Sequence, residues 1–106
     1  MVKWYNDLYL DEKAKKNIKK IKRTIEKEKT LPDVYLICFP MNSSNLFDII
    51  RASDVLYPYY KKAEVTVIGV AYGKNEAIRI IEKMALEVYQ NTDDFDVRGY
   101  FREVAD

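Results

Sequence analysis

Two polar loops could form a binding site for a small anion. Residues 40–45 follow the apolar run 34–39, and residues 73–76 follow a second apolar run, 65–72. We interpret both runs as parallel strands that are buried on both faces, and we expect each loop to open a helix whose free N–H groups attract anions. Because parallel strands end at the same edge of a sheet, the loops 41–45 and 72–76 should together present five polar side chains: Asn42, Ser43, Ser44, Lys74 and Asn75. The same residues are also ordinary helix caps, and this second interpretation stays open.

The residues that common catalytic chemistries require are missing from the chain. The segment 69–75 has three residues between its glycines, where a phosphate-binding P-loop has four, and Asn75 replaces the magnesium-binding hydroxyl. A cysteine phosphatase would need an arginine six positions after Cys38, where Ser44 stands, so we expect Cys38 to be a buried apolar side chain. The chain has no histidine, the commonest general base and nitrogen ligand. Three aspartates could bind a cation but are more typical of a solvated turn: Asp93, Asp94 and Asp96. We therefore expect no catalytic residue, metal or cofactor and favour a protein that is not an enzyme, although the chain leaves that question open.

Residues 11–29 form a predicted helix with an excess of positive charge. They carry nine basic and four acidic groups, a net charge of +5, so the remainder of this +1 chain carries −4. The apolar residues form one narrow stripe at helical spacing: Ala14, Ile18, Ile21 and Ile25. Residues 13–23 could bind nucleic-acid phosphates. This is the weaker alternative, with nucleic acid a disfavoured partner, because the helix has no aromatic side chain on which a base could stack.

Tyrosine is unusually frequent, with nine residues in a chain of 106. Tyrosine is enriched at protein interfaces because its ring is apolar and its hydroxyl can form a hydrogen bond. We therefore expect a self-association interface that contains four tyrosines: Tyr57, Tyr59, Tyr60 and Tyr100.

The pattern of apolar residues predicts one α/β domain over residues 1–106. We expect helices at residues 11–29, at 44–56 and at 75–89, and strands at 34–39, at 65–72 and at 95–102. The order αβαβαβ predicts a small three-layer αβα domain with a short, mainly parallel three-stranded sheet. The last segment alternates apolar and polar residues, which favours an edge strand.

The leading functional hypothesis is a non-catalytic binding or protein-interaction module that forms a homo-oligomer. The alternative is a protein that binds a small anionic ligand through the loops 41–45 and 72–76. We expect a cytoplasmic protein without signal peptide or membrane span, because no long uncharged apolar segment is present and a single cysteine suits a reducing compartment. The abundance of Lys, Ile, Asn and Tyr suggests a bacterial source with an AT-rich genome.

Overall fold

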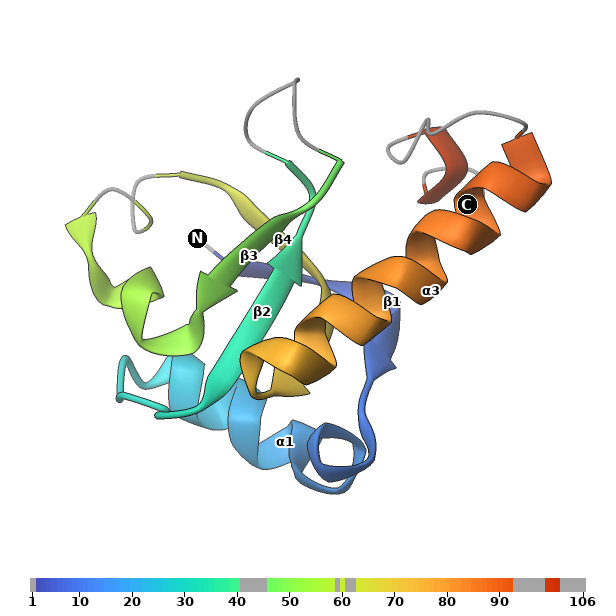
Figure 1. Cartoon of the computed structure of the whole chain (residues 1–106). Helices are drawn as coiled ribbons and strands as arrows, with labels where there is room; N and C mark the ends of the chain where they lie inside the picture. Colours follow the sequence, from blue (N-terminus) through green and yellow to red (C-terminus); the bar gives the residue numbers. More distant parts are fainter. Residues whose placement is uncertain (1, 41–45, 59, 61–62, 93–98, 102–106) are drawn as a thin grey trace.

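A computed structural model describes residues 2–40, 46–58, 60, 63–92 and 99–101 of the chain (Figure 1). Its elements, in order, are β1 (Val2–Leu10), α1 (Glu12–Glu26), β2 (Val34–Cys38), β3 (Asp48–Arg51), the 3₁₀ helix η1 (Ala52–Leu56), β4 (Val65–Tyr72) and α3 (Lys74–Thr92). Residues 99–101 are also helical.

Among the described residues, the sheet has four strands in the order β1-β4-β2-β3 and is mixed, so the predicted three-stranded, mainly parallel sheet is wrong. β1 runs parallel to β4, whereas β2 runs antiparallel to both of its neighbours, β4 and β3. The predicted helix over residues 44–56 is also wrong, because residues 48–51 form β3 and residues 52–56 form η1. Pairing of β3 with β2, from Tyr35 opposite Arg51 to Cys38 opposite Asp48, provides the hydrogen bonds that make this segment a strand.

Strand β1 was not predicted, and it forms the edge of the sheet beside β4. It pairs with β4 from Val2 opposite Val65 to Leu10 opposite Val70, with an irregularity between Trp4 and Tyr9. Residues 99–101 are helical instead of extended, and residues 95–98 lie outside the described part of the chain. The aromatic ring of Phe101 is buried, and it packs edge-to-face on the rings of Tyr5 and Tyr9.

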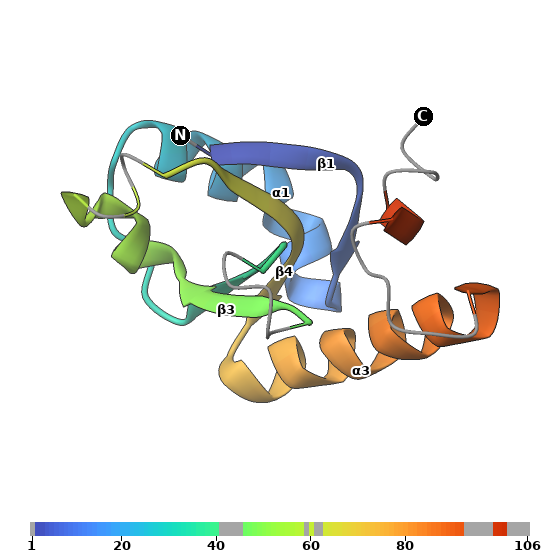
Figure 2. The same cartoon turned by 90° about the horizontal axis from the view of Figure 1, so that it is seen from above.

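The two long helices lie on opposite faces of the sheet (Figure 2). On one face, α1 and η1 pack on one group of buried side chains that includes Ile21, Leu36 and Val67. On the other face, α3 packs on a second group that includes Ile37, Ile68, Met84 and Val88. Successive residues of β2 therefore point to opposite faces, and both faces are covered, as expected for its apolar sequence. The two apolar runs and the apolar face of the helix at 75–89 predict a core that contains Ile37, Ile68, Ile81 and Met84. Burial is confirmed for all of these except Ile81, which is only partly buried.

None of the helices among the described residues is both long enough and apolar enough to cross a membrane.

Candidate functional site

The structure separates the ends of the two strands that were expected to position an anion site. Tyr72, the last residue of β4, lies opposite Val34, the first residue of β2. The carboxyl ends of β2 and β4 therefore point to opposite ends of the sheet. Lys74 and Asn75 are exposed at the start of α3, while the three other predicted site residues lie outside the described part of the chain: Asn42, Ser43 and Ser44. The parallel pairing that would join the two loops is wrong, and the role of the five residues stays a prediction.

The parallel neighbours in this sheet are β1 and β4, and the chain leaves them toward opposite faces. β1 leads into α1, and β4 leads into α3 on the other face of the sheet. In open α/β sheets, ligands bind in the crevice that such a divergence creates. Here a crevice of about 570 Å³ lies at this end, lined by Asp11, Glu12, Lys13, Asp33, Tyr72, Gly73 and Glu76.

Backbone geometry holds the two sides of this crevice together. Asp11 caps α1, since its carboxylate accepts a hydrogen bond of 3.0 Å from the Ala14 N–H. The N–H of Gly73 donates a 2.7 Å hydrogen bond to the carbonyl oxygen of Asp33. Gly73 has a φ of 91° at the turn into α3, where a side chain would be strained. The ammonium of Lys13 lies over the ring of Tyr72, 4.5 Å from its centroid.

The charges in the crevice do not favour an anion. Four of its seven lining residues are acidic, and one is basic. Glu76 already pairs with Arg79 at 2.7 Å, and Asp11 is occupied by the cap. Within the described ranges, no group of three or more His, Cys, Asp or Glu side chains is arranged to hold a metal ion. We assign no ligand to this crevice.

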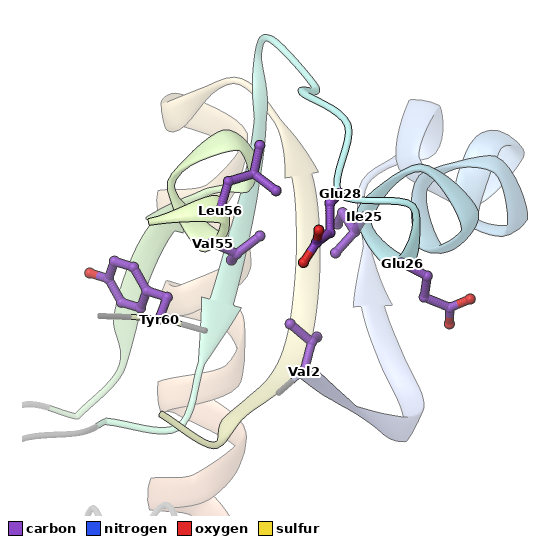
Figure 3. A pocket seen from close by; sticks show the side chains of 7 residues that line it. All are labelled: Val2, Ile25, Glu26, Glu28, Val55, Leu56 and Tyr60. Carbon is purple, nitrogen blue, oxygen red and sulfur yellow. The ribbon is translucent and has the colours of Figure 1, made fainter. Parts of the chain in front are cut away.

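A smaller pocket of about 200 Å³ lies between the start of β1, the end of α1 and η1 (Figure 3). Its walls are mainly apolar: Val2, Ile25, Val55 and Leu56. The side chain of Glu26 points away from the pocket, whereas Tyr60 stands at the opposite wall (Figure 3). Glu28 also lines it and has a φ of 57°, the left-handed conformation that follows the last turn of a helix.

The tyrosines predicted to form an interface belong to different parts of the fold. Tyr60 packs against the buried cluster under α1, whereas Tyr100 packs against the cluster under α3, so the structure does not bring these two together. Tyr57 is 59% exposed beside η1, and Tyr59 lies outside the described residues. The role of these four tyrosines in an interface therefore stays a prediction.

Cys38 has the environment of a structural side chain. It is fully buried in the cluster under α1 and lies opposite Asp48 in the β2–β3 ladder. Burial, and to a smaller extent the Asp48 carboxylate, raises the pKa of the Cys38 thiol to about 12. The thiol is therefore protonated at neutral pH and is not a nucleophile.

Helix α3 carries more apolar surface than the sheet covers. Ala77, Ile80, Met84 and Val88 are buried against the sheet. The hydroxyl of Tyr9 on β1 donates a 2.5 Å hydrogen bond to Glu87, so the flank of α3 that carries Glu87 faces β1. The opposite flank, at helical spacings of 3, 4 and 4, carries four further apolar residues, which we name the α3 strip: Ile78, Ile81, Ala85 and Tyr89.

Two apolar residues at the β3 edge of the sheet share a buried cluster with the α3 strip. Phe47, just before β3, and Ile49 within it are partly buried and pack on the same cluster as Ile81. β3 is the last strand in the sheet order, and no strand among the described residues pairs with its outer edge. We name the α3 strip together with Phe47 and Ile49 the α3–β3 face. The apolar spacing of the helix at 75–89 predicts one broad apolar face that includes Ile78 and Ile81, but Ile78 is 40% exposed, and Tyr89 is 48% exposed.

In comparisons with protein families, curated proteins and solved structures, nothing matches this chain.

Proposed function

We propose that the protein is a non-catalytic interaction module that self-associates through the α3–β3 face. The observation that carries this proposal is the apolar flank of α3 that faces away from β1, with Phe47 and Ile49 packed on the same buried cluster as its Ile81. Of the five large apolar residues that are exposed among the described residues, two belong to this face, Ile78 and Tyr89. Clustered exposed apolar residues mark interaction surfaces, whereas single ones are ordinary.

The size of this face supports a weak dimer. A helix of 19 residues is about 28 Å long, and a helix beside a strand is about 15 Å wide. The outline of the face is therefore about 400 Å², below the roughly 800 Å² per partner of a standard stable interface. We expect a dissociation constant in the micromolar range, typical of a small interface.

The α3 strip is suited to a second copy of itself. Ala85 lies at its centre and has a side chain small enough to let two helices approach closely. A two-fold axis at Ala85 would place Ile81 of each copy against Tyr89 of the other, since both lie four residues from Ala85. The two symmetry-related contacts would then each pair one apolar side chain with another. A two-fold interface requires such a self-complementary patch.

Sedimentation equilibrium tests the proposal with two matched variants. Tyr89→Lys places a charge in the α3 strip, while Tyr57→Lys makes the same change at an exposed tyrosine elsewhere. We expect the wild type and Tyr57→Lys to approach twice the chain mass at ~100 μM and Tyr89→Lys to stay monomeric, since a buried unpaired charge opposes association. Far-UV circular dichroism checks that both variants are folded.

Two outcomes would refute this assignment. A wild type that is monomeric up to ~100 μM would remove self-association altogether. Loss of the dimer in Tyr57→Lys but not in Tyr89→Lys would move the interface away from the α3–β3 face to the surface beside η1.

A further inference from the structure

The outward face of α1 carries a concentrated positive charge. α1 contains seven basic and two acidic residues, a net charge of +5, so the rest of this +1 chain carries −4. Five of the basic residues are exposed and line one shallow hollow of about 360 Å³ along the helix. We name these five residues the basic row: Lys15, Lys16, Lys19, Lys20 and Arg23.

The charges of the basic row are available for an external anion. No ion pair between described residues involves any of the five. Lys13 and Lys22, which are also on α1, lie over the rings of Tyr72 and Trp4 and so are held at its sides. Repulsion within a row of like charges is relieved when counterions or phosphate groups neutralise them.

The uncharged polar side chains of α1 are occupied by the helix itself. The Asn17 amide donates a 2.9 Å hydrogen bond to the carbonyl oxygen of Lys13. The Thr24 hydroxyl donates a 2.8 Å hydrogen bond to the carbonyl oxygen of Lys20. The surface therefore has positive charge but no amide or hydroxyl group directed outward to read the edges of bases.

The packing of α1 disfavours two other polyanionic partners. A helix that lies in a membrane interface needs a free apolar face, but Ala14, Ile21 and Ile25 are all buried against the sheet. A single nucleic-acid strand is held largely by stacking on aromatic rings. α1 has no aromatic residue, and the Trp4 ring lies beneath the ammonium of Lys22.

We infer that the basic row of α1 binds the phosphate backbone of double-stranded DNA without selecting a sequence. Lys15, Lys19 and Arg23 are separated by one helical step of four residues each, about 6 Å along the axis. The row is therefore about 12 Å long, and a duplex carries one charge per ~1.7 Å, so each of the five cations can meet a different phosphate. Because α1 and α3 lie on opposite faces of the sheet, this contact is independent of self-association.

Fluorescence anisotropy with a labelled DNA duplex of ~20 base pairs tests this inference, because five phosphate contacts predict a steep dependence on salt. The slope of log K against log salt should be about −4.5, so binding should weaken about 500-fold between ~50 and ~200 mM KCl. Duplexes of unrelated sequence should bind within about threefold of each other.

A matched pair of double variants separates the basic row from net charge. Lys15→Glu with Lys19→Glu changes the basic row, while Arg79→Glu with Lys83→Glu makes the same change of charge at exposed positions of α3. At ~50 mM KCl, we expect the first variant to bind at least about 100-fold more weakly and the second to change by less than about fivefold. Circular dichroism and the sedimentation profile show that the fold and the association state are retained.

Four results would overturn the inference. The first is no anisotropy change with the DNA duplex at ~50 mM KCl, and the second is an equal loss of binding in both double variants. The third is tighter binding to a single strand or to duplex RNA than to duplex DNA. The fourth is tighter binding to vesicles that contain phosphatidylserine than to duplex DNA. Because each is measured apart from the oligomeric state, failure here is distinguishable from failure of the proposed self-association.

Discussion

Ionisation of the Cys38 thiol in the unfolded chain should lower the free energy of unfolding as the pH rises from 8 to 10. A variant without the thiol should lack this contribution to the pH dependence. Burial raises the pKa of Cys38 from 9.0 to about 12 in the folded state. The folded pKa lies above that of the unfolded chain, so the folded state keeps its proton while the unfolded chain loses it. The stabilisation is complete below pH 9 and is lost as the pH rises toward about 12.

The magnitude follows from the two pKa values. At pH 10, one unit above the unfolded pKa of 9.0, about ten unfolded thiols in eleven are ionised, while the folded thiol is still protonated. Ionisation of this one group should therefore lower the free energy of unfolding by about 1.4 kcal/mol between pH 8 and pH 10. The phenol pKa values of Tyr5 and Tyr9 are also raised from 10.0, so these residues add a further loss mainly above this window.

Urea unfolding at pH 8 and pH 10 measures the effect in the wild type and in Cys38→Ala. The variant starts from a lower stability because it lacks a buried sulfur atom, but its loss between the two pH values should be smaller by about 1.4 kcal/mol. Equal losses in the two proteins would refute the buried position of the thiol. Rapid labelling of native Cys38 by a thiol reagent at pH 8 would refute it independently, since a protonated, buried thiol is inert.

Two further predictions concern positions where the structure gives a clear expectation for the free energy of unfolding in urea. Met84→Ala should destabilise the protein by about 2–5 kcal/mol because Met84 is fully buried under α3. Leu86→Ala, on the same helix but 57% exposed, should cost less than about 1 kcal/mol. Similar losses in the two variants would mean that α3 does not turn Met84 toward the sheet. Asp33→Gly should stabilise by up to about 1 kcal/mol because Asp33 has a φ of 67°, while Glu82→Gly at an exposed position inside α3 should destabilise by about that amount; a loss at both positions would contradict the left-handed conformation of Asp33.

The long elements with strong patterns were predictable from local residues. The helices expected at 11–29 and 75–89 are α1 and α3, and the strands expected at 34–39 and 65–72 are β2 and β4. In α1, the stripe Ala14, Ile21 and Ile25 repeats with the helical period and has no glycine or proline to interrupt it. In β4, the run Val65–Tyr72 combines β-branched residues with an apolar character on both faces.

The short strands and the direction of the central pair depend on contacts that are distant in sequence. Around β3, the spacing of Phe47, Ile49 and Ile50 fits a helix as well as a strand, and pairing with β2 decides between them. β1 was missed because its apolar residues are mixed with Lys3, Asn6 and Asp7, and its register is irregular. An apolar run such as β2 is buried on both faces in a central antiparallel position as well as in a parallel one, so its composition does not give its direction.

The same dependence explains why the candidate site moved. With β2 assumed parallel to β4, the loop after β2 would lie beside Gly73, but the parallel neighbour of β4 is β1, which brings Asp11 and Glu12 to the end of the sheet where Gly73 lies. Carboxylates thus occupy the position where hydroxyl and amide groups were expected. The strand order decides which loops meet at the ends of parallel strands, and so which charged residues line the crevice there. No local sequence pattern specifies that order.

The surfaces proposed for function follow from how much of each helix the sheet can cover. The apolar stripe of α1 is narrow and is largely covered by the sheet and η1, so the rest of its circumference is free to carry Lys15, Lys19 and Arg23. The apolar arc of α3 is broad, and the sheet covers only part of it, so Ile78 and Tyr89 are left exposed. Where one long helix covers each face of a small sheet, a helix whose apolar arc is wider than its contact with the sheet is expected to form an interface with another molecule. A helix whose apolar stripe is fully covered by the sheet leaves the rest of its surface free to carry charge.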